Sequence, residues 1–101
     1  MCANDTMAIS AIKHINLLGF KVPDNISIIG FDDINIASQI SPALTTISVP
    51  VDVVAEQSVK QLLSILHNNE QIYQHAVLPC QLVCRDSSKA QQTHSQTKQA
   101  R

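Results

Sequence analysis

The sequence predicts an α/β fold in which a mostly parallel sheet is flanked by helices. Apolar runs typical of buried strands alternate along the chain with segments whose apolar residues recur at helical spacing. The strand-like runs show almost no alternation of apolar and polar residues, which is typical of parallel strands covered on both faces. Aromatic residues make up only 3% of the chain, so the core must be aliphatic.

The first helix is predicted over residues 6–18, directly after a short apolar run at residues 1–3 that reads as the end of a strand. Its apolar residues recur at the spacing of one helix face. They are Met7, Ala8, Ala11, Ile12, Ile15 and Leu18. Gly19 follows the last turn, where a glycine cap is common. Asp5 precedes the first turn, so its carboxylate is expected to cap the free amide groups there.

Two further strands are predicted in the middle of the chain. Residues 26–31 (ISIIGF) are almost continuously apolar and stop at two consecutive aspartates. Residues 34–40 are predicted to form a short helix, which ends before a proline because proline cannot continue it. Residues 44–49 (LTTISV) are rich in the β-branched residues that favour strands.

A longer helix is predicted over residues 52–67, followed by a loop at residues 67–71 and a last strand at residues 76–85. The helix carries an apolar stripe at helical spacing. The stripe comprises Ala55, Val59, Leu62, Leu63 and Leu66. From Asp86 onward the chain has no periodic apolar residues, so this segment is predicted to be disordered.

The cysteines indicate neither a disulfide nor a zinc site. Cys80 and Cys84 lie four residues apart in the last predicted strand, which separates them by roughly 13 Å. A disulfide needs a Cα separation of about 5.5 Å, and two ligands of one zinc ion must also converge. We therefore expect both side chains to be small buried apolar groups. An odd number of cysteines without such pairing fits a reducing cytoplasm.

Composition and motifs argue against several classes of function. The net charge is −1 and Lys and Arg do not cluster, so there is no nucleic-acid footprint. No stretch reaches the about 18 apolar residues of a membrane span. The histidines His14, His67, His75 and His94 occur without a nucleophile-elbow motif, and the two glycines form no phosphate-binding loop. We predict no enzymatic activity, no metal site and no cofactor.

Acidic residues follow two of the predicted strand ends. Asp5 follows the first, and Asp32 and Asp33 follow the second. Ligands of open parallel sheets bind beyond the carboxyl ends of the strands, where a carboxylate can accept hydrogen bonds from hydroxyl or amine groups. Helix capping by Asp5 and turn formation by the other two are the simpler interpretations. Magnesium binding is disfavoured, because no lysine follows an apolar strand.

The motifs resemble those of the LacI/GalR family of bacterial transcription regulators. They are AND-x-MA-x-x-A, then G-hydrophobic-x-VP-x-x-IS-hydrophobic-x-GFDD, then P-x-LTTI-x-x-P, and finally LP-x-x-LV-x-R-x-S. Together they cover about residues 2–88 in the expected order, which makes the resemblance specific. It implies part of a DNA-binding regulator whose effector-binding domain has the type I periplasmic-binding-protein-like fold. The alternative is a fragment of a periplasmic sugar-binding transport protein, which shares the fold.

The resemblance also implies a ligand site and a dimer interface. The family's effector-contacting aspartate matches Asp5, beside Asn4, and the effector is often a sugar or a nucleobase. Val49 lies in the crossover near the cleft, where it can offer only packing. The helix over residues 6–18 resembles one that takes part in dimerisation. The residues expected at that interface are Ile9, Ile12 and Lys13.

The same resemblance implies a C-terminal fragment of the family's effector domain. Residues 1–47 and 78–88 would form the C-terminal lobe, residues 48–77 the crossover and a helix of the other lobe, and residues 89–101 a disordered tail. The parent would be a cytoplasmic homodimer that does not enter a membrane. It would contact operator DNA only through an N-terminal helix-turn-helix headpiece that precedes these residues.

Overall fold

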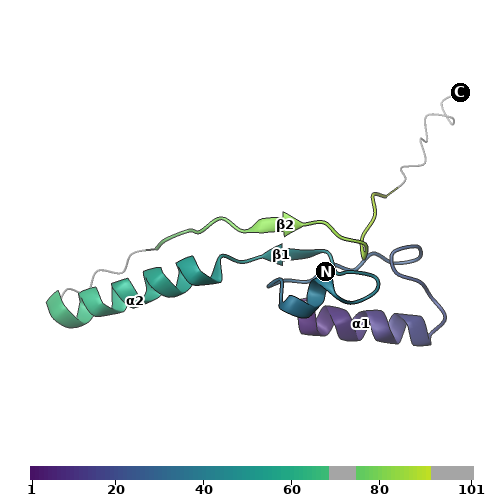
Figure 1. Ribbon diagram of the computed structural model, residues 1–101, viewed down its shortest axis with the longest axis horizontal. Coiled ribbons are helices and arrows are strands. Elements are labelled where there is room, and N and C mark those ends of the chain that lie inside the picture. The colour runs from purple at the N-terminus through teal and green to yellow at the C-terminus, as the bar shows by residue number, and fades with distance from the viewer. Residues whose placement is uncertain (69–74, 92–101) are drawn as a thin grey trace, which may run out of the picture.

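The computed structural model describes residues 1–68 and 75–91. Its elements are α1 (Asp5–Leu17), the 3-10 helix η1 (Asn35–Ser38), β1 (Thr46–Ser48), α2 (Val51–Asn68) and β2 (Gln81–Val83). Figure 1 shows α1 at one end of the molecule and α2 at the other, with the β1–β2 pair between them. Helices and a small sheet agree with the predicted α/β class. Most of the predicted loop at 67–71 and the last ten residues of the predicted tail lie outside the described residues.

Helix α1 is capped by Asn4. The side-chain oxygen Oδ1 of Asn4 accepts a hydrogen bond from the amide of Met7 at 2.8 Å. The prediction that Asp5 caps this helix is therefore wrong. Asparagine and aspartate cap helices about equally well, and capping by the earlier residue places Asp5 inside the first turn.

The predicted glycine cap at the other end of α1 is confirmed. Gly19 has a φ of +89°, which a residue without a side chain adopts at little cost. The amide of Gly19 donates to the carbonyl of Asn16 at 3.1 Å. The amide of Phe20 donates to the carbonyl of Ile15 at the same distance. These two bonds form a Schellman cap, which satisfies the last carbonyls of the helix.

The segment predicted as a strand at residues 26–31 is hydrogen-bonded on both sides but forms no continuous ladder. Its amide-to-carbonyl bonds include Cys2 to Ile29 (2.8 Å), Asp5 to Phe31 (2.9 Å), Gly30 to Thr45 (2.9 Å) and Asp32 to Ile47 (3.0 Å). Two isolated bridges, Ile29 with Thr45 and Asp32 with Ser48, are parallel as predicted. The pairing stays short because the chain turns away at Asp32 and Asp33, both of which have positive φ.

The regular ladder within the described part of the chain is antiparallel, which differs from the mostly parallel sheet predicted. Strand β1 pairs with β2 in the register Thr46 with Val83, Ile47 with Leu82 and Ser48 with Gln81. The strand predicted at 76–85 is thus reduced to three residues. Pro79 has no amide hydrogen to donate before β2. After β2, the amide of Arg85 donates to the side chain of Thr45 at 2.9 Å and not to a backbone carbonyl.

A small aliphatic core lies where α1 meets the hydrogen-bonded segments. Its buried members are Ala8, Ile12, Val22, Ile28, Ala37 and Leu44, and Cys2, Ile9, Ile15 and Ile40 pack against them. Cys80 and Cys84 are exposed, so the prediction that they are buried is wrong. Strand β2 is one edge of a two-stranded sheet and its side chains face solvent, as the 60% exposure of Leu82 shows.

Helix α2 keeps its predicted bounds to within one residue at each end. Its apolar stripe faces solvent, since Val59, Leu62, Leu63 and Leu66 are between 47% and 66% exposed. On the polar face Lys60 pairs with Glu56 at 2.7 Å. The hydrogen bond from Lys60, and then its charge, lower the pKa of the Glu56 carboxyl.

The residues from Asp86 to Lys89 are ordered, so the prediction of disorder is wrong for this segment. Ser87 is fully buried. Its hydroxyl donates to the carbonyl of Ile28 at 2.6 Å and accepts from the amide of Thr45 at 2.8 Å. The amide of Lys89 donates to the Ser27 hydroxyl at 3.2 Å. The segment therefore docks through polar side chains, which leave no apolar periodicity in the sequence.

Candidate functional site

The Asp5 carboxylate is the centre of a buried polar cluster. It is fully buried, and each oxygen has a partner within the chain. The hydroxyl of Thr46 donates to Oδ1 at 2.6 Å, and the amide of Ile34 donates to Oδ2 at 2.8 Å. One carboxylate thus joins the start of α1 to the turn before η1 and to β1. Hydrogen bonds to a charged acceptor are among the stronger ones in proteins.

Gly30 makes room for this carboxylate. A Cβ atom built on Gly30 would collide with Oδ1 of Asp5 and would lie 3.2 Å from its Cγ and 3.0 Å from Cδ2 of Leu44. The amide of Gly30 also donates to the carbonyl of Thr45, which fixes the backbone at this position. The glycine of the GFDD motif therefore permits a close approach between backbone and carboxylate.

The turn beside Asp5 has an unusual backbone. Asp32 and Asp33 have φ values of +115° and +60°. The second lies in the left-handed region that aspartate tolerates, and the first lies beyond it. Asp33 forms an ion pair with Arg85 at 2.9 Å, with both side chains about one-fifth exposed. Arg85 also donates from Nη1 to the carbonyl of Leu44 at 2.9 Å, so it joins the turn to the core.

Of the other predicted ligand residues, Asn4 lies beside this cluster and Val49 lies farther along the chain. Asn4 is half-buried, and its Oδ1 is engaged in capping α1. Val49 is half-buried and follows β1, three residues beyond Thr46. Three residues of extended chain span about 10 Å, so Val49 is separated along the strand from the contact with Asp5. The structure thus brings Asn4 and Asp5 together and places Val49 farther along the same path.

The predicted interface residues occupy three environments on α1. Ile12 is 5% exposed and belongs to the core. Ile9 is half-buried and packs against the core, while Lys13 is exposed. Met7 and Leu17 of the same helix are 57% and 73% exposed. The exposed side of α1 is therefore partly apolar.

Several residues of the cluster were not predicted from the sequence. Thr46 looked like a strand-former, Arg85 like the end of a strand and Ser87 like part of a tail. Their partners are about 40 or more residues away, with separations of 41 for Thr46 and Asp5 and 59 for Ser87 and Ile28. The LTTI motif was the only sequence signal that could have drawn attention to the threonine.

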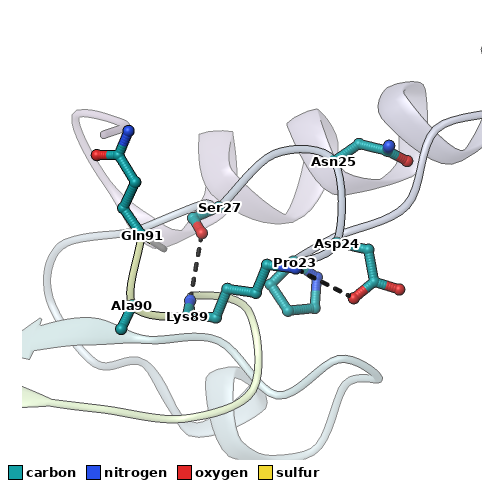
Figure 2. A pocket seen from close by; sticks show the side chains of 7 residues that line it. All are labelled: Pro23, Asp24, Asn25, Ser27, Lys89, Ala90 and Gln91. Carbon is teal, nitrogen blue, oxygen red and sulfur yellow. Dashed lines mark hydrogen bonds and ion pairs between the residues drawn. The ribbon is translucent and has the colours of Figure 1, made fainter. Parts of the chain in front are cut away.

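Figure 2 shows a hollow whose lining includes none of the residues that contact Asp5. It has a volume of about 520 Å³. Its lining residues are Pro23, Asp24, Asn25, Ser27, Lys89, Ala90 and Gln91. Lys89 lies 3.6 Å from Asp24 across it, and both side chains are more than half exposed. These partners are solvated, so the hollow lacks the buried polar groups found around Asp5.

Residues 1–68 and 75–91 contain neither a metal-binding cluster nor a membrane-spanning helix. No group of three or more His, Cys, Asp or Glu side chains in these ranges is arranged to hold a metal ion. No helix in the same ranges is both long and apolar enough to cross a membrane.

Comparison with known proteins defines the class of this domain. Residues 1–88 match the family model of the periplasmic binding protein-like domain. The solved lac repressor dimer, bound to operator and the anti-inducer ONPF, superposes with a TM-score of 0.77 at 35% identity, covering 87% of this chain and 30% of that one. A LacI family regulator from Enterococcus faecium with bound ribose gives a TM-score of 0.74 at 31% identity, covering 85% and 32%.

The relatives narrow this class to regulators of transcription. The probable repressor ExuR of Bacillus subtilis (strain 168) is 38% identical over 86 residues, which cover 85% of this chain and 26% of that protein. A lactose operon repressor of Rhizobium radiobacter is 33% identical over 89 residues, which cover 88% and 78%. The chain therefore belongs to the periplasmic binding protein-like domain family, among the LacI-type transcriptional regulators. These matches favour a regulator over a transport protein, and the chain spans about a quarter of the length of ExuR.

Proposed function

We propose that this chain is the C-terminal part of the effector-binding domain of a LacI-type transcriptional repressor. The observation that carries the proposal is its likeness in fold and sequence to a repressor solved with operator and anti-inducer. The effector would be a sugar or a nucleoside-like molecule, and two solved relatives contain ribose. The parent would act in the cytoplasm as a homodimer. It would bind operator DNA through a headpiece outside these residues.

The ligand-contacting residues would be Asp5, Asn4 and Val49. A carboxylate suits a ligand rich in hydroxyl groups, because each oxygen can accept more than one hydrogen bond. Thr46 and the Ile34 amide leave part of that capacity unused. Val49 would pack against the apolar face of a sugar ring. The chain would bind the effector without transforming it, so we assign it no enzymatic reaction.

The proposed organisation has two lobes. Residues 1–47 and 78–88 would form one lobe, and residues 48–77 would cross to the other lobe and contribute a helix to it. The exposed apolar stripe of α2 supports this assignment, because such a stripe ordinarily packs against another element. The antiparallel β1–β2 pair would carry the chain out of the first lobe and back again.

The proposed dimer contact uses α1. Ile9 and Lys13 would face the partner subunit, while Ile12 would hold the helix against the core from behind. The exposed side chains of Met7 and Leu17 add apolar surface to the same helix. An effector that binds one arrangement of the lobes more tightly would then change the affinity for operator DNA, which is a coupling between two sites.

Calorimetric titration of the 101-residue chain tests the binding role, with D-ribose, D-galactose and adenosine as probes. We expect Asp5→Asn to weaken binding of the accepted probe by about 10- to 100-fold, because one charge-assisted hydrogen bond is lost. Asp52→Asn is the matched control, since it removes the same charge from the exposed start of α2. Equal effects of the two substitutions on the binding of an accepted probe would overturn the proposal.

A further inference from the structure

We propose that the outer edge of β2, the edge that does not face β1, is an oxidation-dependent contact with a second copy of this chain. The two β2 strands pair antiparallel around a two-fold axis at Leu82. Cys80 of each copy then forms a disulfide with Cys84 of the other copy. The contact is independent of the proposed effector site, so either can fail without the other.

The outer edge of β2 is open to another strand. One edge of β2 pairs with β1, and no strand within residues 1–68 and 75–91 pairs with the other. In Figure 1 the outer edge lies on the side of the sheet away from α1. Edge strands are usually protected from association by charged side chains, prolines or bulges. Residues 80–84 (CQLVC) carry no charge and no proline, and Leu82 is 60% exposed.

The backbone groups of Leu82 point to the outer edge. In an antiparallel pair, successive residues direct their amide and carbonyl groups alternately toward the partner strand and away from it. The carbonyl of Ile47 accepts a hydrogen bond from the amide of Asp32, so Ile47 faces away from β2. Leu82 is the partner of Ile47 in the register and must therefore face away from β1. Its amide and carbonyl can thus bond to a second strand.

The two cysteines have the same orientation as Leu82, because each lies two residues from it along the strand. Side chains two residues apart share a face of the strand, and backbone groups two residues apart share an edge. The amide of Arg85 supports this alternation, since it donates in the opposite direction, to the Thr45 side chain at 2.9 Å. Both cysteines are exposed and neither forms a disulfide, so their thiols are accessible.

A two-fold axis at Leu82 brings unlike cysteines together. In a symmetric antiparallel pair, Cys80 of one copy is directly opposite Cys84 of the other, on both sides of the axis. The Cα atoms of such a hydrogen-bonded pair are about 5.5 Å apart, within the usual range for a disulfide. The Cβ atoms are about 1 Å farther apart than a relaxed disulfide needs, so the bond is strained and easily reduced. Both cysteines lie just outside the regular ladder, where the backbone can shift.

The covalent step is thiol–disulfide exchange, with glutathione disulfide as the oxidant. The Cys80 thiolate attacks one sulfur of glutathione disulfide, forms a mixed disulfide and releases one glutathione thiolate. The Cys84 thiolate of the second copy attacks the Cys80 sulfur and releases the other glutathione thiolate. Two electrons and the two thiol protons pass from the cysteines to glutathione for each disulfide formed. In a reducing cytoplasm the thiols stay free, and the contact forms only when the glutathione pool is oxidised.

Complementation between two single variants tests the register. The 101-residue chain is incubated with glutathione disulfide, and covalent dimers are separated by electrophoresis without reductant. We expect a dimer from the unmodified chain, which dithiothreitol reverses. Cys80→Ser and Cys84→Ser should each lose the dimer, because the remaining cysteine faces serine in the second copy. An equimolar mixture of the two variants should restore the dimer, because the remaining cysteines then face each other.

A second pair of variants tests the strand pairing. Leu82→Pro removes an amide hydrogen that points to the outer edge and leaves the β1 side intact. Leu82→Ala is the matched control, because it shortens the side chain and keeps the amide. We expect proline to slow dimer formation by about tenfold and alanine by less than about threefold, since only proline removes hydrogen bonds across the axis. Complementation decides the proposal if circular dichroism shows that proline disturbs the fold.

Four results would overturn the proposal. The first is equal dimer formation by the single variants alone and by their mixture, which would report random collisions of exposed thiols. The second is a disulfide within one chain, or one that involves Cys2, identified by mass spectrometry. The third is a folded proline variant that dimerises as fast as the alanine variant. The fourth is loss of the dimer when Leu62→Gln and Leu66→Gln are introduced together, because α2 would then hold the copies together.

Discussion

Replacing Gly30 with alanine should destabilise the chain through a single close contact. The added Cβ would collide with Oδ1 of Asp5, whereas its next neighbour, Cδ2 of Leu44, lies at 3.0 Å and ends a flexible side chain. The carboxylate must move, and its bonds to Thr46 and to the amide of Ile34 would be lost or weakened. Hydrogen bonds to a charged group contribute about 1.5–3 kcal/mol each, so the two together contribute about 3–6 kcal/mol.

One smaller effect opposes this loss. Alanine restricts the unfolded chain more than glycine does, which stabilises a folded protein by about 0.4–1 kcal/mol. We therefore expect the free energy of unfolding to fall by at least about 2 kcal/mol. Whole domains are stable by only about 5–15 kcal/mol, so the change should be easy to measure. Urea unfolding followed by circular dichroism, at concentrations where the midpoint is constant, gives the value.

A double-mutant cycle identifies the cause. With Asp5→Ala in the background, no carboxylate remains for the new methyl group to meet, and Gly30→Ala should cost less than about 0.5 kcal/mol. An equal cost with and without Asp5 would refute the reasoning, because the strain would then arise elsewhere. Gly19→Ala is a useful comparison, since it adds a methyl group into open space at a φ of +89° and tests backbone strain alone.

Three other variants test separate features. Ser87→Ala should lower the free energy of unfolding by about 2–4 kcal/mol in a urea melt, because it leaves two buried backbone groups unpaired; a change under about 0.5 kcal/mol would contradict its role. We expect the exposed apolar stripe of α2 to cause self-association, which Leu62→Gln with Leu66→Gln should reduce in sedimentation velocity without lowering stability; unchanged sedimentation would contradict this expectation. Lys60→Gln should raise the NMR-measured pKa of Glu56 toward its ordinary value. The lowered pKa of Glu56 stabilises the folded chain at pH values above the pKa of this carboxyl in the unfolded chain, and the stabilisation is lost as the pH falls through the pKa in the folded chain. Lys60→Gln should therefore lower the free energy of unfolding mainly above that range.

Elements with strong periodicity could be predicted from the sequence. Helix α2 and the glycine cap of α1 follow from apolar spacing and from Gly19, which are local signals. The choice between Asn4 and Asp5 as the cap was not decided locally, because both residue types suit the position. In the structure Asn4 caps the helix, and the Asp5 carboxylate instead accepts a hydrogen bond from the hydroxyl of Thr46, 41 residues away.

The remaining differences have the same physical origin. At the end of the small sheet, backbone groups form hydrogen bonds with polar side chains in place of other backbone groups. Side chains in this role leave no periodic pattern of apolar residues in the sequence. Arg85 ends the pairing of β2 early by donating its amide to the Thr45 side chain. Ser87 gives order to a segment that looks like a tail by composition. The motifs indicated the right family because they contain residues such as Arg85 and Ser87. The contacts of these residues could not be worked out from their spacing in the sequence.

The position of Ser87 in the chain has a consequence for biosynthesis. Its hydroxyl bonds to Thr45 and Ile28, which precede it by 42 and 59 residues. At a synthesis rate of about 5–20 residues per second, the ribosome needs roughly 2–8 s to add the 42 residues that follow Thr45 up to and including Ser87. Throughout that interval the amide of Thr45 and the carbonyl of Ile28 lack their final partner. The nascent chain therefore presents an unfinished strand edge, and chaperone protection during those seconds would favour folding over association.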